Sequence, residues 1–212
     1  MLALPAPVSA RSPLPAWLVA GPEPELASRI IQQRRYPMGH ELSLMLGTLP
    51  ADPFSRSLSL SGSYTWHASD HWGWQVLQGT YVMSQATELA ASLALLSGVQ
   101  ATALPERPGL RMAVGSHLVL KPFYGKLAAG QGGMLYVEAF LLLGPGLYGL
   151  RRLDGSDAVA TGGDWAAGAR LHLGDVISLR GQVGQSVFLL QAHPYQALRV
   201  ELGVAWNFGG DA

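Results

Sequence analysis

Apolar and polar residues alternate along eight stretches of the chain, and the pattern is clearest near the C-terminal end. Between residues 199 and 208, one side of the pattern holds Val200, Leu202, Val204, Trp206 and Phe208, and the other holds Arg199, Glu201, Gly203, Ala205 and Asn207. Strict alternation of this kind predicts a β-strand with two different faces. The same pattern predicts strands at residues 40–47, 57–67, 72–82, 110–121, 135–144, 165–172 and 177–189.

The length and number of these strands indicate a membrane protein. A tilted strand needs about 9–11 residues to span a bilayer, whereas strands of globular proteins average about 5–6. We therefore expect an all-β fold, an eight-stranded antiparallel transmembrane β-barrel over residues 37–210, with both termini periplasmic. An N-terminal segment, residues 1–36, would precede it as a Pro-rich or short helical segment. This segment is either a remnant export signal or a Pro-rich lead-in of the mature protein.

Two strands carry face assignments that depend on unbroken alternation. Strand 72–82 is predicted to place Trp72, Trp74, Val76, Thr80 and Val82 on the apolar face, and Gln75, Gly79 and Tyr81 on the polar face. Strand 110–121 is predicted to place Leu110 on the apolar face and Arg111 on the polar face.

The polar faces carry the charged residues of the predicted strands. These are Glu41, Arg111, Lys121, Glu138, Arg170, Arg180, Arg199 and Glu201. An eight-stranded barrel is just wide enough to be filled by side chains, and unpaired buried charges are costly. We therefore expect the arginines to pair with the glutamates in a dry network inside the barrel. Such a network argues against a diffusion pore and leaves a narrow ion pathway as the alternative.

The apolar faces carry aromatic residues near the strand ends. They are Trp66, Trp72, Trp74, Trp165, Trp206 and Phe208. Aromatic girdles at both interfaces are typical of outer-membrane barrels.

The connections fit the same topology. Residues 68–70 and 174–175 predict tight turns, and the links 49–56, 84–108, 148–163 and 190–196 are longer. The link 122–133 is longer than a periplasmic turn should be. Short helices are predicted at residues 25–35 and, in the 84–108 loop, at 87–96. That helix either folds onto the rim or docks a partner.

Composition narrows the class further. The chain is 49% hydrophobic and 13% charged, against about 25% charged in a typical soluble protein. The net charge is zero, so nothing indicates nucleic-acid binding. There is no cysteine, which suits passage through an oxidising periplasm. No run of 18 apolar residues predicts a transmembrane helix.

Several short motifs resemble the outer-membrane β-barrel domain family expanded in myxobacteria and related Gram-negative bacteria. They are Arg34-Arg35, Gly39-His40-Glu41-Leu42, Asp52-Pro53-Phe54, Trp72-Gly73, the run KPFYGK at 121–126 and the closing Asn207-Phe208-Gly209. The resemblance covers roughly residues 34–210, and it departs at His40, where the family often has Arg. It implies an outer-membrane barrel, with some relatives associated with envelope machineries including gliding motility. It implies no catalytic residue.

The last strand also resembles the signal that the barrel assembly machinery reads. Glu201, Gly203, Trp206 and Phe208 match its spacing of one polar residue, one glycine and two hydrophobic residues. The expected partners are outer-membrane lipids, this machinery and other envelope proteins.

Enzyme chemistry is the main alternative. An outer-membrane lipid-modifying enzyme would use His40 with Glu41, His67, His71, His117 or His172, and serines in the range 57–63 as nucleophiles. No spacing brings such a set together, and no phosphate-binding loop, metal-ligand motif or cofactor motif occurs. We therefore expect no enzyme, no cofactor and no metal. A soluble lipocalin-like carrier is a third hypothesis. The favoured one is a structural or interaction component of an envelope assembly, with residues 1–36 and 84–108 as its interaction surfaces.

Overall fold

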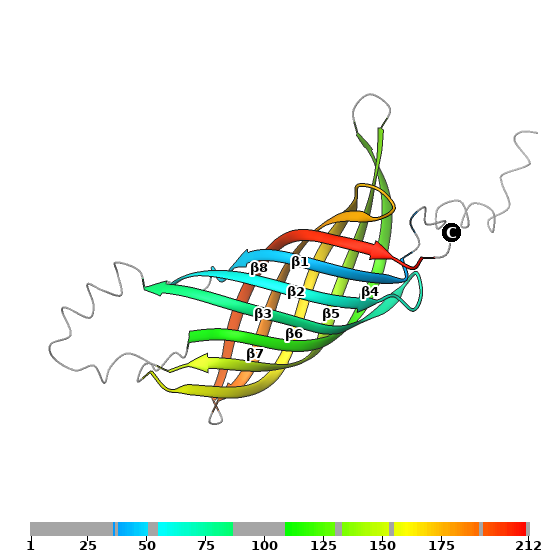
Figure 1. Ribbon diagram of the computed structural model, residues 1–212. Helices are drawn as coiled ribbons and strands as arrows, with labels where there is room; N and C mark the ends of the chain where they lie inside the picture. The colour runs from blue at the N-terminus through cyan, green and yellow to red at the C-terminus, as the bar shows by residue number, and fades with distance from the viewer. Residues whose placement is uncertain are drawn as a thin grey trace, which may run out of the picture. The chain divides into compact units, whose positions relative to one another are not determined.

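The computed structural model describes residue 36 and residues 38–50, 55–86, 109–129, 133–152, 155–190 and 193–210. They form a closed antiparallel β-barrel in which consecutive strands pair and β1 pairs with β8 (Figure 1). The strands are β1 (His40–Thr48), β2 (Ser55–Trp66), β3 (Trp72–Ala86), β4 (Gly109–Ala129), β5 (Gly133–Arg151), β6 (Asp157–His172), β7 (Ile177–Leu190) and β8 (His193–Phe208). The predicted eight-stranded closed barrel is confirmed.

The helices predicted at residues 25–35 and 87–96 lie outside the described residues. Within the part of the chain that is described there is no helix, and hence none long and apolar enough to cross a membrane. The predicted helical insertion therefore has no support.

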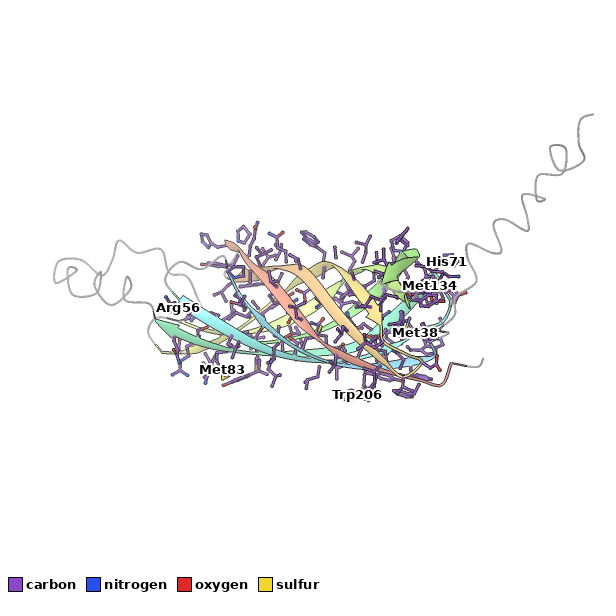
Figure 2. All side chains as sticks on the ribbon, turned by 90° about the horizontal axis from the view of Figure 1, so that it is seen from above. Met38, Arg56, His71, Met83, Met134 and Trp206 are labelled. Carbon is purple, nitrogen blue, oxygen red and sulfur yellow. The ribbon has the colours of Figure 1, made fainter. Side chains whose placement is uncertain are left out.

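Side chains alternate between the barrel interior and its outer wall, as period-two strands require (Figure 2). In β8, for example, Glu201 and Asn207 are buried, whereas Leu202 and Trp206 are exposed. The polar faces predicted from the sequence are thus interior faces, and the apolar faces form the outer wall.

A β-bulge in β3 overturns part of one predicted face. The register with β4 shifts between Gln75 and Gln78, so the strand changes phase there. Thr80 and Val82 are consequently buried inside the barrel, and Tyr81 is 50% exposed on the outer wall. Their predicted faces were wrong, because a bulge adds a residue that strict alternation does not count.

A second bulge lies at Arg111 in β4. The register with β5 shifts between Leu110 and Met112, which leaves Arg111 without a cross-strand partner. Leu110 is buried inside the barrel at 6% exposure, whereas Arg111 points outward with half its side chain exposed. The prediction that Arg111 belongs to the interior network was therefore wrong.

The connections are shorter than predicted because the strands continue into them. Residues 122–129 belong to β4, 148–151 to β5 and 157–163 to β6. β4 pairs with β5 as far as Ala129 and Gly133, whereas β3 pairs with β4 only as far as Trp72 and Leu120. The β4–β5 hairpin therefore extends past its neighbours at the end where β1 begins and β8 finishes (Figure 1). We call this the terminal end of the barrel, and the opposite end the loop end.

Candidate functional site

The interior of the barrel holds most of its chemistry, and Glu41 on β1 is the centre of the charged part. Arg170 on β6 donates to its Oε2, and Arg180 Nη1 on β7 donates to its Oε1 at 2.8 Å. The Nε2 atom of His67 lies 3.2 Å from the same Oε2. Glu41 thus joins three strands and the β2–β3 turn, and it is fully buried.

Two further charges extend this cluster. Arg170 also donates through Nη1 to Glu138 on β5, and Lys121 Nζ on β4 lies 3.3 Å from His67 Nδ1. Burial lowers the pKa of His67, which lies just beyond the end of β2. A neutral imidazole can accept from Lys121 at Nδ1 while it donates to Glu41 at Nε2.

A hydrogen-bonded chain leads from this cluster toward the middle of the barrel. Arg180 Nη2 donates to Gln182 Oε1 at 3.0 Å, and Gln182 Nε2 donates to Glu201 Oε2 at 2.7 Å. Ser61 also donates to Glu201. The ring of Phe140 lies beneath the guanidinium groups, with its centroid 4.5 Å from Arg180 Cζ.

A second ionic cluster surrounds Asp164 on β6. Arg199 Nη2 donates to its Oδ1 at 3.2 Å, Ser186 donates to the same oxygen, and His117 Nε2 lies 3.4 Å from Oδ2. Asp164 was not among the interior residues predicted from the sequence. Continuing the alternation of β6 upstream from Arg170 in steps of two would have found it on the interior face.

Seven of the eight residues predicted to form the interior network therefore lie inside the barrel. Including Asp164, four acidic and four basic side chains of the described residues lie inside the barrel, all nearly inaccessible to solvent. They are Glu41, Glu138, Asp164, Glu201, Lys121, Arg170, Arg180 and Arg199. We call this set the interior charge network.

The loop end of the interior is filled by apolar side chains instead. The cluster consists of Leu49, Val82, Leu110, Ala113, Tyr148, Leu150, Ala160 and Phe188. Tyr148 and Phe188 stack with ring centroids 4.9 Å apart. The charge network and this cluster thus occupy successive stretches of the interior.

Aromatic rings gather at the terminal end. Tyr36 stacks on His172 at 5.3 Å between centroids and meets Tyr136 edge-on at 5.1 Å. Lys126 Nζ lies 5.6 Å from the centroid of the Tyr136 ring, at the base of the extended hairpin.

Several residues considered for catalysis form hydrogen bonds to neighbouring polar side chains instead. Ser43 pairs with Ser63, and Ser57 with Ser84. His40 Nδ1 lies 2.8 Å from the Tyr64 hydroxyl, and His71 lies in the exposed β2–β3 turn. His117 and Ser186 bind opposite oxygens of Asp164, so these contacts do not order serine, histidine and carboxylate as a catalytic relay would. Among the described residues, no group of three His, Cys, Asp or Glu could hold a metal ion.

The predicted aromatic girdle lies mostly at one end. Trp66, Trp72, Trp74, Trp206 and Phe208 are exposed on the outer wall at or near the strand ends of the terminal end. Trp165 is also outward, but it lies in the middle of β6. The Trp74 indole donates to Ser116 Oγ at 2.9 Å, which satisfies two polar groups on the apolar wall.

The assembly-signal residues lie on β8, the strand that closes the barrel. Glu201 points inward, and Trp206 and Phe208 point outward. A Cβ atom at Gly203 would lie 2.0 Å from the carbonyl oxygen of Leu44 on β1. Glycine is therefore required here by close contact between the first and last strands.

Comparisons with known proteins give likeness of structure only. No protein-family model matches the chain, and no curated protein matches it, so the resemblance to the myxobacterial barrel family stays a prediction. Similar solved structures include the N-terminal β-barrel domain of Pseudomonas aeruginosa OprF, with 9% identity and a TM-score of 0.48, covering 81% of this chain and 99% of that one.

Two further solved structures show the same kind of likeness. Neisserial surface protein A has 11% identity and a TM-score of 0.41, covering 80% of this chain and 94% of that one. Ail, the attachment invasion locus protein of Yersinia pestis, has 15% identity and a TM-score of 0.38, covering 81% of this chain and 100% of that one.

Proposed function

We propose that this protein is a non-enzymatic, non-conducting barrel of a Gram-negative outer membrane, and that it serves as a structural or interaction component of an envelope assembly. The observation that carries the proposal is the distribution of charge. Each charged side chain of the described residues either belongs to the interior charge network or lies at one end of the barrel. The loop-end group is Arg56, Arg111, Arg151, Arg152 and Asp157, and the terminal-end group is Asp70, Lys126 and Asp175.

The wall between these two groups has the dimensions of a bilayer core. Trp66 and Arg56 are ten residues apart on β2 and both point outward. Ten residues of a strand tilted by about 40° rise roughly 25 Å, which is the height of the apolar band of outer-membrane barrels. Leu58 and Leu60 fill this interval on β2 and are 50% and 41% exposed. Leaving such a wall in water would be unfavourable, and lipid removes that cost.

The filled interior argues against conduction. The charge network and the apolar cluster occupy successive stretches of the barrel interior, and their side chains are nearly inaccessible to solvent. Purified protein reconstituted in planar bilayers should give no step-like currents, whereas a known porin measured in parallel should give them. Discrete conductance steps from this protein would refute the non-conducting proposal.

The β4–β5 hairpin is the described element best suited to contact a partner. Its outer side carries Phe123, 61% exposed, and Leu127, 56% exposed, beyond the level of the aromatic girdle. Past Leu120, β4 makes one more backbone hydrogen bond on this side, from Lys121 N to His71 O, and the pairing register with β3 does not continue beyond it. From residue 122 onward, this edge of the hairpin is therefore not paired with β3. The surfaces predicted at residues 1–36 and 84–108 lie almost wholly outside the described residues.

Site-specific crosslinking in intact cells tests the interaction role. A photo-crosslinking residue at Leu127 should give a protein adduct, whereas the same residue at Leu202, on the membrane-facing wall, should give lipid adducts. Mass spectrometry of the Leu127 adduct would identify the assembly, including whether it is a motility machinery as the family resemblance suggests. The absence of any protein adduct at Leu127 would count against the hairpin as an interaction element.

A further inference from the structure

The described charged residues on the outer wall at the loop end include more arginines than carboxylates. Arg111 on β4 and Arg151 on β5 share one carboxylate, with Nη1 atoms 3.9 Å and 3.4 Å from Asp157 Oδ1 on β6. All three side chains are about half exposed or more. One carboxylate cannot neutralise two guanidinium groups, so this trio presents a net positive charge beside the apolar wall.

Arg56 forms a second positive position on the same rim. It borders a surface hollow of about 570 Å³ whose lining includes Leu58, Met83 and Gln85. Figure 2 shows Arg56 and Met83 at the end of the barrel opposite Trp206. An arginine at the rim of a partly apolar hollow combines a site for an anionic headgroup with a surface for an acyl chain.

The two ends of the wall thus differ in chemistry. Aromatic residues mark the terminal end, whereas arginines mark the loop end roughly 25 Å away, at the height where lipid phosphates begin. Guanidinium groups bind phosphate through paired hydrogen bonds and are more weakly hydrated than ammonium groups.

We propose that Arg56, Arg111 and Arg151 bind the phosphate groups of anionic lipids in the leaflet at the loop end, where Asp157 offsets part of the charge of Arg111 and Arg151. This inference rests on the proposed membrane-spanning function. The arginine rim would fix the height of the barrel in the membrane and enrich anionic lipids around it.

The test measures lipid selectivity of the full-length protein. The protein is folded into phosphatidylcholine vesicles and into vesicles of phosphatidylcholine mixed with phosphatidylglycerol. The relative association of spin-labelled phosphatidylglycerol and phosphatidylcholine is then measured by electron paramagnetic resonance. Arg56→Gln should lower the phosphatidylglycerol preference about fivefold, since each basic residue near an anionic surface contributes on that scale. Arg111→Gln with Arg151→Gln should lower it at least as much.

Asp157→Asn provides a control of opposite sign, because it frees both arginines and should raise the preference. Lys126→Gln removes one positive charge from the hairpin at the terminal end. This variant should keep the wild-type preference for phosphatidylglycerol. If all variants insert but keep the wild-type preference, the arginine proposal is overturned while the membrane-spanning function stands. If the wild type inserts in neither vesicle, both are overturned. If free inorganic phosphate abolishes the preference, the ligand is a soluble anion and the lipid assignment is wrong.

Discussion

Replacing Glu41 by glutamine should be among the most damaging single changes in the barrel. The substitution keeps the size of the side chain but removes the carboxylate that binds Arg170, Arg180 and His67. The interior charge network of four acids and four bases is neutral with neutral histidines, so Glu41→Gln leaves four cations facing three carboxylates.

The magnitude follows from which partners remain. Arg170 keeps its contact with Glu138, whereas the hydrogen-bonding groups left to Arg180 include Gln182, which is uncharged. Removing one partner of a buried ion pair costs about 3–5 kcal/mol. We expect the free energy of unfolding to fall by about 4 kcal/mol in Glu41→Gln. The double variant Glu41→Gln with Arg180→Gln restores neutrality. Its loss of unfolding free energy should be smaller than the sum of the two single-variant losses by about 1–3 kcal/mol.

Urea titration of the barrel in lipid vesicles, followed by tryptophan fluorescence, measures these losses. Asp175→Asn, in the exposed β6–β7 turn, is the matched control and should change stability by less than about 0.5 kcal/mol. The reasoning is refuted if Glu41→Gln costs less than about 1 kcal/mol or if the two single losses simply add.

Three further predictions concern the outer wall, the β1–β8 pairing that closes the barrel, and His67 in the β2–β3 turn. If the outer wall faces lipid as proposed, Leu202→Arg should lower the free energy of unfolding by about 2–4 kcal/mol in urea titrations, whereas Leu127→Arg on the hairpin should be tolerated. Equal losses in the two variants would contradict the proposed position of the membrane. Gly203→Ala should lower the yield of folded barrel in a gel-mobility assay because its Cβ would overlap a backbone carbonyl of β1, whereas Gly79→Ala has open space and serves as the control. Burial lowers the pKa of His67, so the unfolded chain binds its proton first and stability should fall as pH drops below about 6.5; a pH series of urea midpoints should show this, and His67→Gln should flatten it.

Alternation predicted the location of all eight strands, because successive residues of a strand face opposite sides. The closed barrel was predicted from the number and length of those strands and from the aromatic residues near their ends. The predicted faces were wrong where a β-bulge adds a residue to one strand. Because of the bulge in β3, Thr80 and Val82 lie inside the barrel rather than outside. Because of the bulge in β4, Arg111 lies outside rather than inside. A bulge is set by the partner strand, and the sequence of one strand does not contain it.

The pairing within the candidate site was less accessible to sequence. Glu41 meets Arg170 and Arg180 across the barrel although they are far apart along the chain. Such pairings depend on strand tilt, which places different register positions at the same height. Asp164 was missed for a simpler reason, since the predicted strand began one residue after it. The end-to-end difference of the outer wall appeared only once Arg111 was placed outside.

The position of the charge network also bears on how the chain completes its fold. β8 carries Arg199 and Glu201, which supply the cation for Asp164 and the acceptor for Gln182 and Ser61. β1, which β8 must reach to close the barrel, carries Glu41. Until the last strand arrives, Asp164 lacks this cation and β1 has a free edge. Pairing of β8 with β1 therefore completes the charge network in the same step. This predicts that the barrel folds and unfolds in a single cooperative transition rather than strand by strand.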